Sequence, residues 1–204
     1  MARRPRDAEA TRRDILDAAQ KRFSEKGFGS TSLAEIGRDC GCATSLIVHH
    51  FGSKEALWST VKDRAFSGFV EERSRLYRDR PVSLEDLKDT TEAYFRLLQR
   101  HPQLVQLLIR AELEHDLATN RFNTEQLAPF VERMREAQQA GLLRDDVPAA
   151  HVLLIVINVI TRWFEARHMF RGWDELAGKD MDDQFLESVK RVIFGGAVAP
   201  GGQA

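Results

Sequence analysis

Apolar residues recur every three or four positions along most of the chain, and no stretch alternates convincingly between apolar and polar residues. A spacing of three to four places side chains on one face of an α-helix. One face of residues 7–26, for example, carries Ile15, Ala19 and Phe23. Only six prolines interrupt the pattern. The pattern therefore predicts an all-α protein of about nine helices.

Caps and helix breakers set the expected boundaries of these helices. Serine is a favoured N-cap, proline suits a first helical turn, and glycine commonly ends a helix. These signals predict a loop at 119–123 and helices at 32–40, 43–49, 53–78, 83–99, 103–117, 124–140, 148–170 and 180–195, besides the one at 7–26. Residues 1–6 and 196–204 are expected to be flexible tails.

Residues 31–57 carry the most informative pattern. Ser32 and Glu35 form a capping box that begins a short helix, and Gly41 ends it because glycine adopts the left-handed conformation without strain. A second short helix follows, and Ser53 caps a third. Two short helices joined by a glycine turn make a helix-turn-helix, whose second helix fits the major groove of DNA. The pattern predicts a head that binds double-stranded operator DNA.

The helix expected at 148–170 is apolar around most of its circumference. Such a helix is buried on several sides, and in a chain of 204 residues one side is expected to meet a second copy of the chain. Together with the last helix it would form a four-helix interface about a two-fold axis. The expected interface residues of this homodimer are Val152, Ile155, Val159, Phe185, Val189 and Val192.

Composition and charge change this picture only slightly. Apolar residues make up 43% and charged residues 30% of the chain, and the net charge is −1. Residues 1–64 hold 12 Lys and Arg against 9 Asp and Glu, a net of +3, and the remainder holds 18 against 22, a net of −4. A mildly basic head on an acidic body fits DNA binding by the head.

Nothing near the N-terminus reads as a secretion signal, because it is rich in arginine and lacks an apolar run. The longest uninterrupted apolar run, 152–157, is far shorter than the roughly 20 residues that span a membrane. We therefore expect a cytoplasmic protein with no membrane partner, in a compartment where thiols are reduced.

The chemistry-bearing residues make no catalytic or cofactor motif. The sequence holds no spaced His and Glu metal set, no glycine-rich phosphate loop and no nucleophile elbow. No cofactor is expected, and an all-helical enzyme is a distant alternative. Cys40 and Cys42 suggest a metal or redox pair, but we favour the interpretation that they are buried fillers. His49 and His50 point about 100° apart on a helix, which favours DNA contact over a metal.

The run from Ile15 to Leu57 resembles the TetR (tetracycline-repressor) family of bacterial transcriptional regulators. The matching features are ILDAAQKRFSEKGFGSTSLAEIG, then Cys40-Gly41-Cys42, then HHFGSKEAL, in the family's order and spacing. The resemblance implies a homodimer with a DNA-binding head at 7–52 and, at 53–195, a body that dimerises and binds a small molecule. The implied function is a ligand-responsive regulator, in the first place a repressor that its effector releases from the operator.

The same resemblance assigns the DNA-binding residues. It places Thr44, Ser45, Leu46 and His49 on the recognition helix, facing base edges. The hydroxyls donate or accept, Leu46 can touch a thymine methyl group, and His49 can donate to a purine. It places His50 and Lys54 near phosphates. Ser30, Thr31 and Ser32 precede the helix expected at 32–40 and could bind phosphate at its N-terminus.

Two positions depart from the family pattern. Val48 stands where the family usually has a tyrosine whose hydroxyl reaches a phosphate, so one anchor is missing. Ala43 stands where a serine often caps the recognition helix. Thr44 is the alternative cap, and in that role it would not read bases.

Binding pockets are mostly apolar with a few polar groups, so polar residues that interrupt the apolar body are the expected ligand contacts. They are Arg110, Asn158 and Arg162, with Trp163 as an aromatic lining residue. Each can equally be an ordinary core or surface residue. The expected effector is apolar or aromatic. The alternative function is a DNA-binding regulator whose body binds a protein partner or no ligand.

Overall fold

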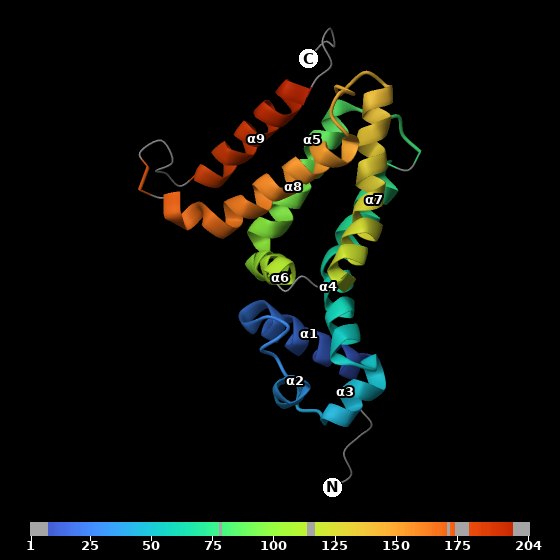
Figure 1. Cartoon of the computed structure of the whole chain (residues 1–204), viewed down its shortest axis with the longest axis vertical. Helices are drawn as coiled ribbons and strands as arrows, with labels where there is room; N and C mark the ends of the chain where they lie inside the picture. The colour runs from blue at the N-terminus through green and yellow to red at the C-terminus, as the bar shows by residue number, and fades with distance from the viewer. Residues whose placement is uncertain (1–7, 78, 114–116, 171, 174–179, 198–204) are drawn as a thin grey trace. The chain divides into compact units, whose positions relative to one another are not determined.

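The computed structural model describes residues 8–77, 79–113, 117–170, 172–173 and 180–197. At 110–113, 117–125 and 196–197 it describes the backbone but not the side chains. These residues form α-helices and one short 3-10 helix without any strand, which confirms the predicted all-α fold (Figure 1). The elements are α1 (Ala8–Lys26), α2 (Leu33–Cys40), α3 (Thr44–Phe51), α4 (Lys54–Tyr77), α5 (Leu84–Arg100), α6 (Pro102–Leu113), α7 (Leu117–Gln139), α8 (Ala149–Ala166), η1 (Arg167–Phe170) and α9 (Met181–Ala197).

Two predicted boundaries are wrong. The loop expected at 119–123 lies inside α7, which begins at Leu117. Its asparagines and threonine are weak helix formers, but each costs less than about 1 kcal/mol relative to alanine. No glycine or proline stands at 119–123 to break the helix. The helix expected to reach residue 170 changes to the tighter 3-10 form at Arg167.

The chain divides into two compact units. The head unit comprises the residues up to Gly68 together with 106–124, and the body unit comprises 69–105 and the residues from Glu125 onward. The sequence had suggested a boundary at residue 53. The head unit extends further because Leu57, Trp58 and Val61 of α4 are buried in its core.

Aromatic packing and ion pairs hold α1, α2 and α4 together in the head unit. The rings of Phe23 and Trp58 meet edge to face with centroids 4.8 Å apart, a favourable aromatic geometry. Arg22 binds the carboxylate of Asp39 through two hydrogen bonds of 2.5 and 2.6 Å, which tie α1 to the last turn of α2. This core also contains Ile15, Leu16, Ala19, Ile36, Ile47 and Leu107.

In the body unit, α8 and α9 lie side by side with α5 against both of them (Figure 1). The carboxylate of Asp182 joins all three helices. It accepts hydrogen bonds from Trp163 Nε1 at 2.9 Å, from Gln99 Nε2 at 3.1 Å and from Arg167. Burial raises the pKa of Asp182, but these donors outweigh it and keep that pKa below its usual value. Asp182 therefore remains ionised and fixes α9 in place.

The segment Ala149–Phe170 is long and apolar enough to cross a membrane by length and composition alone, although its uninterrupted apolar run is short. Core helices of soluble proteins pass the same test. Here Val152, Val156 and Ile160 on one side of α8 are buried in the body unit, so that the apolar composition already has a structural use.

Candidate nucleic-acid interface

The predicted capping box at the start of α2 is present. Ser32 Oγ accepts a hydrogen bond from the Glu35 backbone N–H at 3.2 Å, and the Ser32 N–H donates to Glu35 Oε2 at 2.9 Å. The Lys26 ammonium donates to the other oxygen of Glu35 at 3.1 Å. The backbone N–H of Ser32, then Lys26 and the Ser32 hydroxyl lower the pKa of Glu35 to about 2.

This low pKa predicts a pH-dependent contribution of Glu35 to the stability of the head unit. The folded pKa lies below the ordinary 4.5, so the contribution is complete above pH 4.5 and is lost as pH falls towards 2. Glu35→Gln removes the titrating group. The difference in urea unfolding midpoint between wild type and variant should therefore shrink on acidification. A difference that stayed constant between neutral pH and about pH 3 would contradict this assignment.

The tight turn between α2 and α3 depends on two glycines, one for its backbone conformation and one for the space that it leaves. Gly41 has φ 65° and ψ 35°, the left-handed conformation, and its N–H donates to the Gly37 carbonyl oxygen. The N–H of Cys42 donates to the same oxygen at 2.9 Å. A Cβ on the buried Gly37 would stand 2.7 Å from the Cys42 carbonyl oxygen, so the backbone of the turn occupies the space of a side chain.

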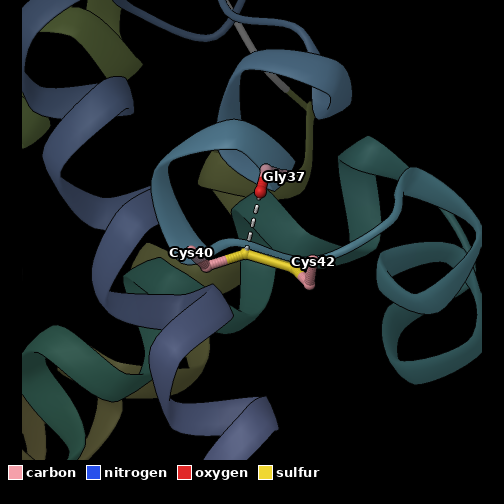
Figure 2. Close-up of a disulfide and its surroundings, with 3 residues drawn as sticks. All are labelled: Gly37, Cys40 and Cys42. Carbon is pink, nitrogen blue, oxygen red and sulfur yellow. Dashed lines mark hydrogen bonds between the residues drawn. A yellow bond between two sulfur atoms is a disulfide. The ribbon is translucent and has the colours of Figure 1, made fainter. Parts of the chain in front are cut away.

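The two cysteines of this turn differ from the predicted buried fillers. A disulfide joins Cys40 and Cys42 (Figure 2). Their Cα atoms are 5.5 Å apart, and both residues are only half-buried at the edge of the head core. The two cysteines are therefore bonded to each other at the edge of the core, and are not separate buried side chains.

Helix α3 contacts the head core mainly through Ile47, its one fully buried residue. Five of its eight residues are exposed: Thr44, Ser45, Leu46, Val48 and His49. Exposed apolar side chains are prominent among them, since Leu46 is 37% and Val48 44% exposed. Ala43 holds the N-cap position without a side-chain hydrogen bond, so Thr44 does not act as the alternative cap and is presented to solvent.

The predicted phosphate contacts have mixed positions. Ser30 and Ser32 are exposed. Thr31 is only 2% exposed, and its hydroxyl donates to the Gly27 carbonyl at 2.7 Å, so the prediction that it meets a phosphate is corrected: Thr31 closes the turn after α1. Ser53 Oγ caps α4 by accepting from the Ala56 N–H at 3.1 Å.

The two remaining residues predicted near phosphates lie at the ends of α3 and α4. His50 is half-buried, and its ring centroid lies 5.6 Å from that of His49. Lys54 Nζ lies 4.2 Å above the ring of Phe28, which gives it a cation–π partner within the head unit. Both side chains are therefore partly engaged within the head unit.

The residues predicted for the dimer interface fall into two groups. Ile155, Val159 and Val192 are 50%, 36% and 74% exposed, and Leu154, which the sequence analysis did not single out, is 46% exposed. Val152 and Val189 are buried within the chain. The half-buried Phe185 stacks on Trp163 with ring centroids 4.0 Å apart.

The residues predicted to bind a ligand do not converge. Asn158 is exposed and donates to the Leu154 carbonyl, while Arg162 is exposed and paired with Glu165 at 2.5 Å. Trp163 is 5% exposed and fully engaged by Asp182 and Phe185. The side chain of Arg110 lies outside the described residues.

Comparisons with known proteins cover both units. The family described as bacterial regulatory proteins, tetR family, matches residues 15–60, and the tetracyclin repressor-like C-terminal domain matches residues 86–193. The chain is 26% identical over 204 residues to the HTH-type transcriptional repressor NicS of Pseudomonas putida, covering 95% of each chain.

Solved structures share the fold at lower identity. A TetR family transcription regulator from Marinobacter aquaeolei superposes with a TM-score of 0.74 at 16% identity, over 94% of this chain and 97% of that one. SmeT, the repressor of the Stenotrophomonas maltophilia multidrug efflux pump SmeDEF, gives 0.69 at 22% identity, over 96% and 94%. With an exposed helix-turn-helix in the head unit and family matches that together span most of the sequence, the chain belongs to the TetR family of bacterial transcriptional regulators.

Proposed function

We propose that this protein is a dimeric repressor whose affinity for operator DNA is lowered by a small-molecule effector. The observation that carries the proposal is the exposed surface of α3. A short helix that buries one residue and presents Leu46 and Val48 to solvent fits a helix that docks into a groove. The name of NicS supports repression as the sign of regulation.

The chemistry of α3 is suited to base edges. Thr44 and Ser45 offer hydroxyls at the start of the helix, where recognition helices make their base contacts. Leu46 and Val48 offer apolar surface to thymine methyl groups, and His49 offers a ring nitrogen to a purine. Phosphate contacts from Ser30, Ser32 and Lys54 would fix the register without reading sequence.

The proposal is tested by binding-site selection from a random duplex library with the purified full chain. The expected result is a two-fold symmetric sequence whose half-sites lie about 34–36 Å, or one helical turn, apart. Because phosphate contacts alone give no sequence preference, recovery of unrelated sequences with uniform affinity would count against recognition by α3.

A stripe of residues on α8 supports dimerisation through this helix. Residues three or four apart share one face of a helix. One face of α8 therefore carries Ile155, Asn158, Val159 and Arg162. We infer that Asn158 and Arg162 serve as polar residues of the subunit interface, since both are exposed beside apolar side chains. Val192 of α9 would add to the same surface.

Ile155→Glu is expected to weaken the dimer about a hundredfold or more, because two-fold symmetry buries the new unpaired carboxylate twice. Light scattering and sedimentation over a concentration series measure this shift. Leu76→Glu is the matched control, since Leu76 of α4 is similarly exposed at 46%. If Ile155→Glu dimerised like the control, this face of α8 would not be the interface.

Effector control requires that the ligand prefer a conformation in which the two heads are wrongly spaced for DNA. Within the body unit the rings of Phe69, Tyr94 and Phe130 lie together, with centroid distances of 6.0 and 5.7 Å. Tyr94 also shares a 2.9 Å hydrogen bond with Thr161. This half-buried aromatic cluster with one hydroxyl pair supports an apolar or aromatic effector more than the residues predicted from sequence do.

The effector arm of the proposal has a separate test. A library of aromatic and aliphatic carboxylates, phenols and amines is screened by thermal shift, and each stabilising compound is then added to the protein–operator complex. We expect that a stabilising compound releases the DNA from the wild-type protein. In Phe130→Ala the same compound should no longer release it. Intact operator binding that no compound alters would instead favour a body that binds a protein partner or no ligand.

A further inference from the structure

The Cys40–Cys42 disulfide spans the turn of the helix-turn-helix. Cys40 is the last residue of α2, Gly41 forms the left-handed cap, and Cys42 comes just before the N-cap of α3 (Figure 2). Both cysteine residues are half-buried at the edge of the head core, so that neither is enclosed within it. The bridge therefore sits between the helix that supports the recognition helix and the recognition helix itself.

This bridge is poorly suited to be a structural staple. The stabilisation by a disulfide grows with the length of the chain segment that it closes, and here a single residue separates the two cysteines. Disulfides in the reducing interior of a cell, where a regulator meets its DNA, are mostly transient or redox-sensing. A short bridge at a functional turn is therefore better explained by its reversibility than by its contribution to folding.

We propose that Cys40 and Cys42 are a reversible thiol–disulfide pair that controls operator affinity, with a low-molecular-weight disulfide as the oxidant. The thiolate of Cys42 attacks one sulfur of the oxidant and releases one thiol. The Cys40 sulfur then attacks the mixed disulfide and releases the second thiol. The chain loses two electrons and two protons, and the oxidant gains both as two thiols.

The direction of control follows from what holds α3. The N–H groups of Gly41 and Cys42 both donate to the Gly37 carbonyl oxygen, and the Cys40 sulfur lies 3.7 Å from it. In the dithiol no covalent bond between side chains spans this turn, which contains a glycine in the left-handed conformation. The bridge adds a covalent restraint across Gly41 in the helix-turn-helix geometry. The oxidised chain is therefore the more preorganised DNA-binding form.

The experiment uses the full chain in buffers of glutathione and glutathione disulfide at fixed ratios. Mass spectrometry under denaturing conditions, after free thiols are alkylated, measures the fraction bridged. Fluorescence anisotropy with the selected operator duplex measures affinity in the same samples. We expect reversible bridging and an affinity about three- to tenfold higher in the oxidised chain, a gain typical of removing local flexibility before binding.

The matched control is Cys40→Ser with Cys42→Ser, which keeps the size of both side chains and is checked for an unchanged circular dichroism spectrum. Its affinity should equal that of the reduced wild type at every glutathione ratio. Cys42→Ala with Cys40 retained can form only a mixed disulfide with glutathione, so its operator affinity should not rise in oxidising buffer. No bridging in oxidising buffer, or equal or weaker DNA binding by the bridged chain, overturns the inference.

This inference rests on the proposed function only because its test measures operator binding. The experiment can therefore contradict the redox control and the proposed function independently. A chain that bridges reversibly but selects no DNA in either redox state would contradict the proposed function. A chain that binds its operator equally well in both states, with bridging verified by mass, would contradict the redox control alone.

Discussion

Gly37→Ala should destabilise the head unit by up to about 2 kcal/mol, even though alanine is ordinarily the better helix residue. The new Cβ would stand 2.7 Å from the Cys42 carbonyl oxygen, which belongs to the backbone of the turn. That turn cannot easily yield, because the Cys42 N–H is bonded to the Gly37 carbonyl at 2.9 Å. Overpacking typically costs about 1–3 kcal/mol, and a clash with backbone lies towards the upper end, above the roughly 1 kcal/mol that alanine gains in a helix.

The same substitution should lower operator affinity about tenfold or more. Any relief of the clash moves Cys42 and with it the start of α3, and misplacing a recognition helix loses base contacts worth about 1–3 kcal/mol each. Urea unfolding measures the first effect, and anisotropy with the operator duplex measures the second. Both are measured at a temperature where the variant remains folded.

Gly68→Ala is the matched control for this prediction. Gly68 is an exposed residue of α4, and a Cβ on it meets nothing within 4 Å. The substitution should therefore stabilise the protein by about 0.5–1 kcal/mol through helix propensity alone. If Gly37→Ala behaved like Gly68→Ala, the close approach of the turn to α2 would not be a real constraint on the fold.

The largest loss of DNA binding is expected for His49→Glu. His49 is an exposed residue of α3, so the substitution should leave the unfolding midpoint almost unchanged. In the groove it would replace a hydrogen-bond donor by an anion close to bases and phosphates. The lost contact and the added repulsion act once in each subunit, and together they should weaken operator binding about a hundredfold or more.

His168→Glu provides the comparison for His49→Glu. His168 is an exposed residue of η1 in the body unit, so it adds the same charge to a surface outside the proposed interface. Its operator affinity should stay within about twofold of wild type at the same salt concentration. A loss of similar size in both variants would mean that net charge, and not the position on α3, determines binding.

The helix caps and the glycine turn of the head unit could be predicted from sequence because each depends on residues close together in the chain. The Ser32–Glu35 capping box, the left-handed Gly41 and the Ser53 cap of α4 all involve groups within four residues of one another. Backbone geometry alone then brings donor and acceptor together. For the same reason the order of the helices and most of their ends followed from caps and breakers.

Tertiary structure decided which side chains face outward. Thr31 looked available to a phosphate, but its position beside the Gly27 carbonyl buries it. Asn158 and Arg162 looked like ligand contacts, yet they lie on the exposed side of α8. A helix that is apolar around most of its circumference has no single stripe to mark its inner face, so periodicity could not distinguish these sides.

The sequence by itself determined an all-α chain with a helix-turn-helix head, because helical periodicity and capping are local properties. Only the tertiary structure decided that Trp163 is held by Asp182, nineteen residues further along, and that Gly37 makes room for the carbonyl of Cys42. It likewise separated the buried Val152 and Val189 from the exposed Ile155 and Val192. These outcomes depend on which elements pack together, and a pattern along one helix carries no information about its neighbours.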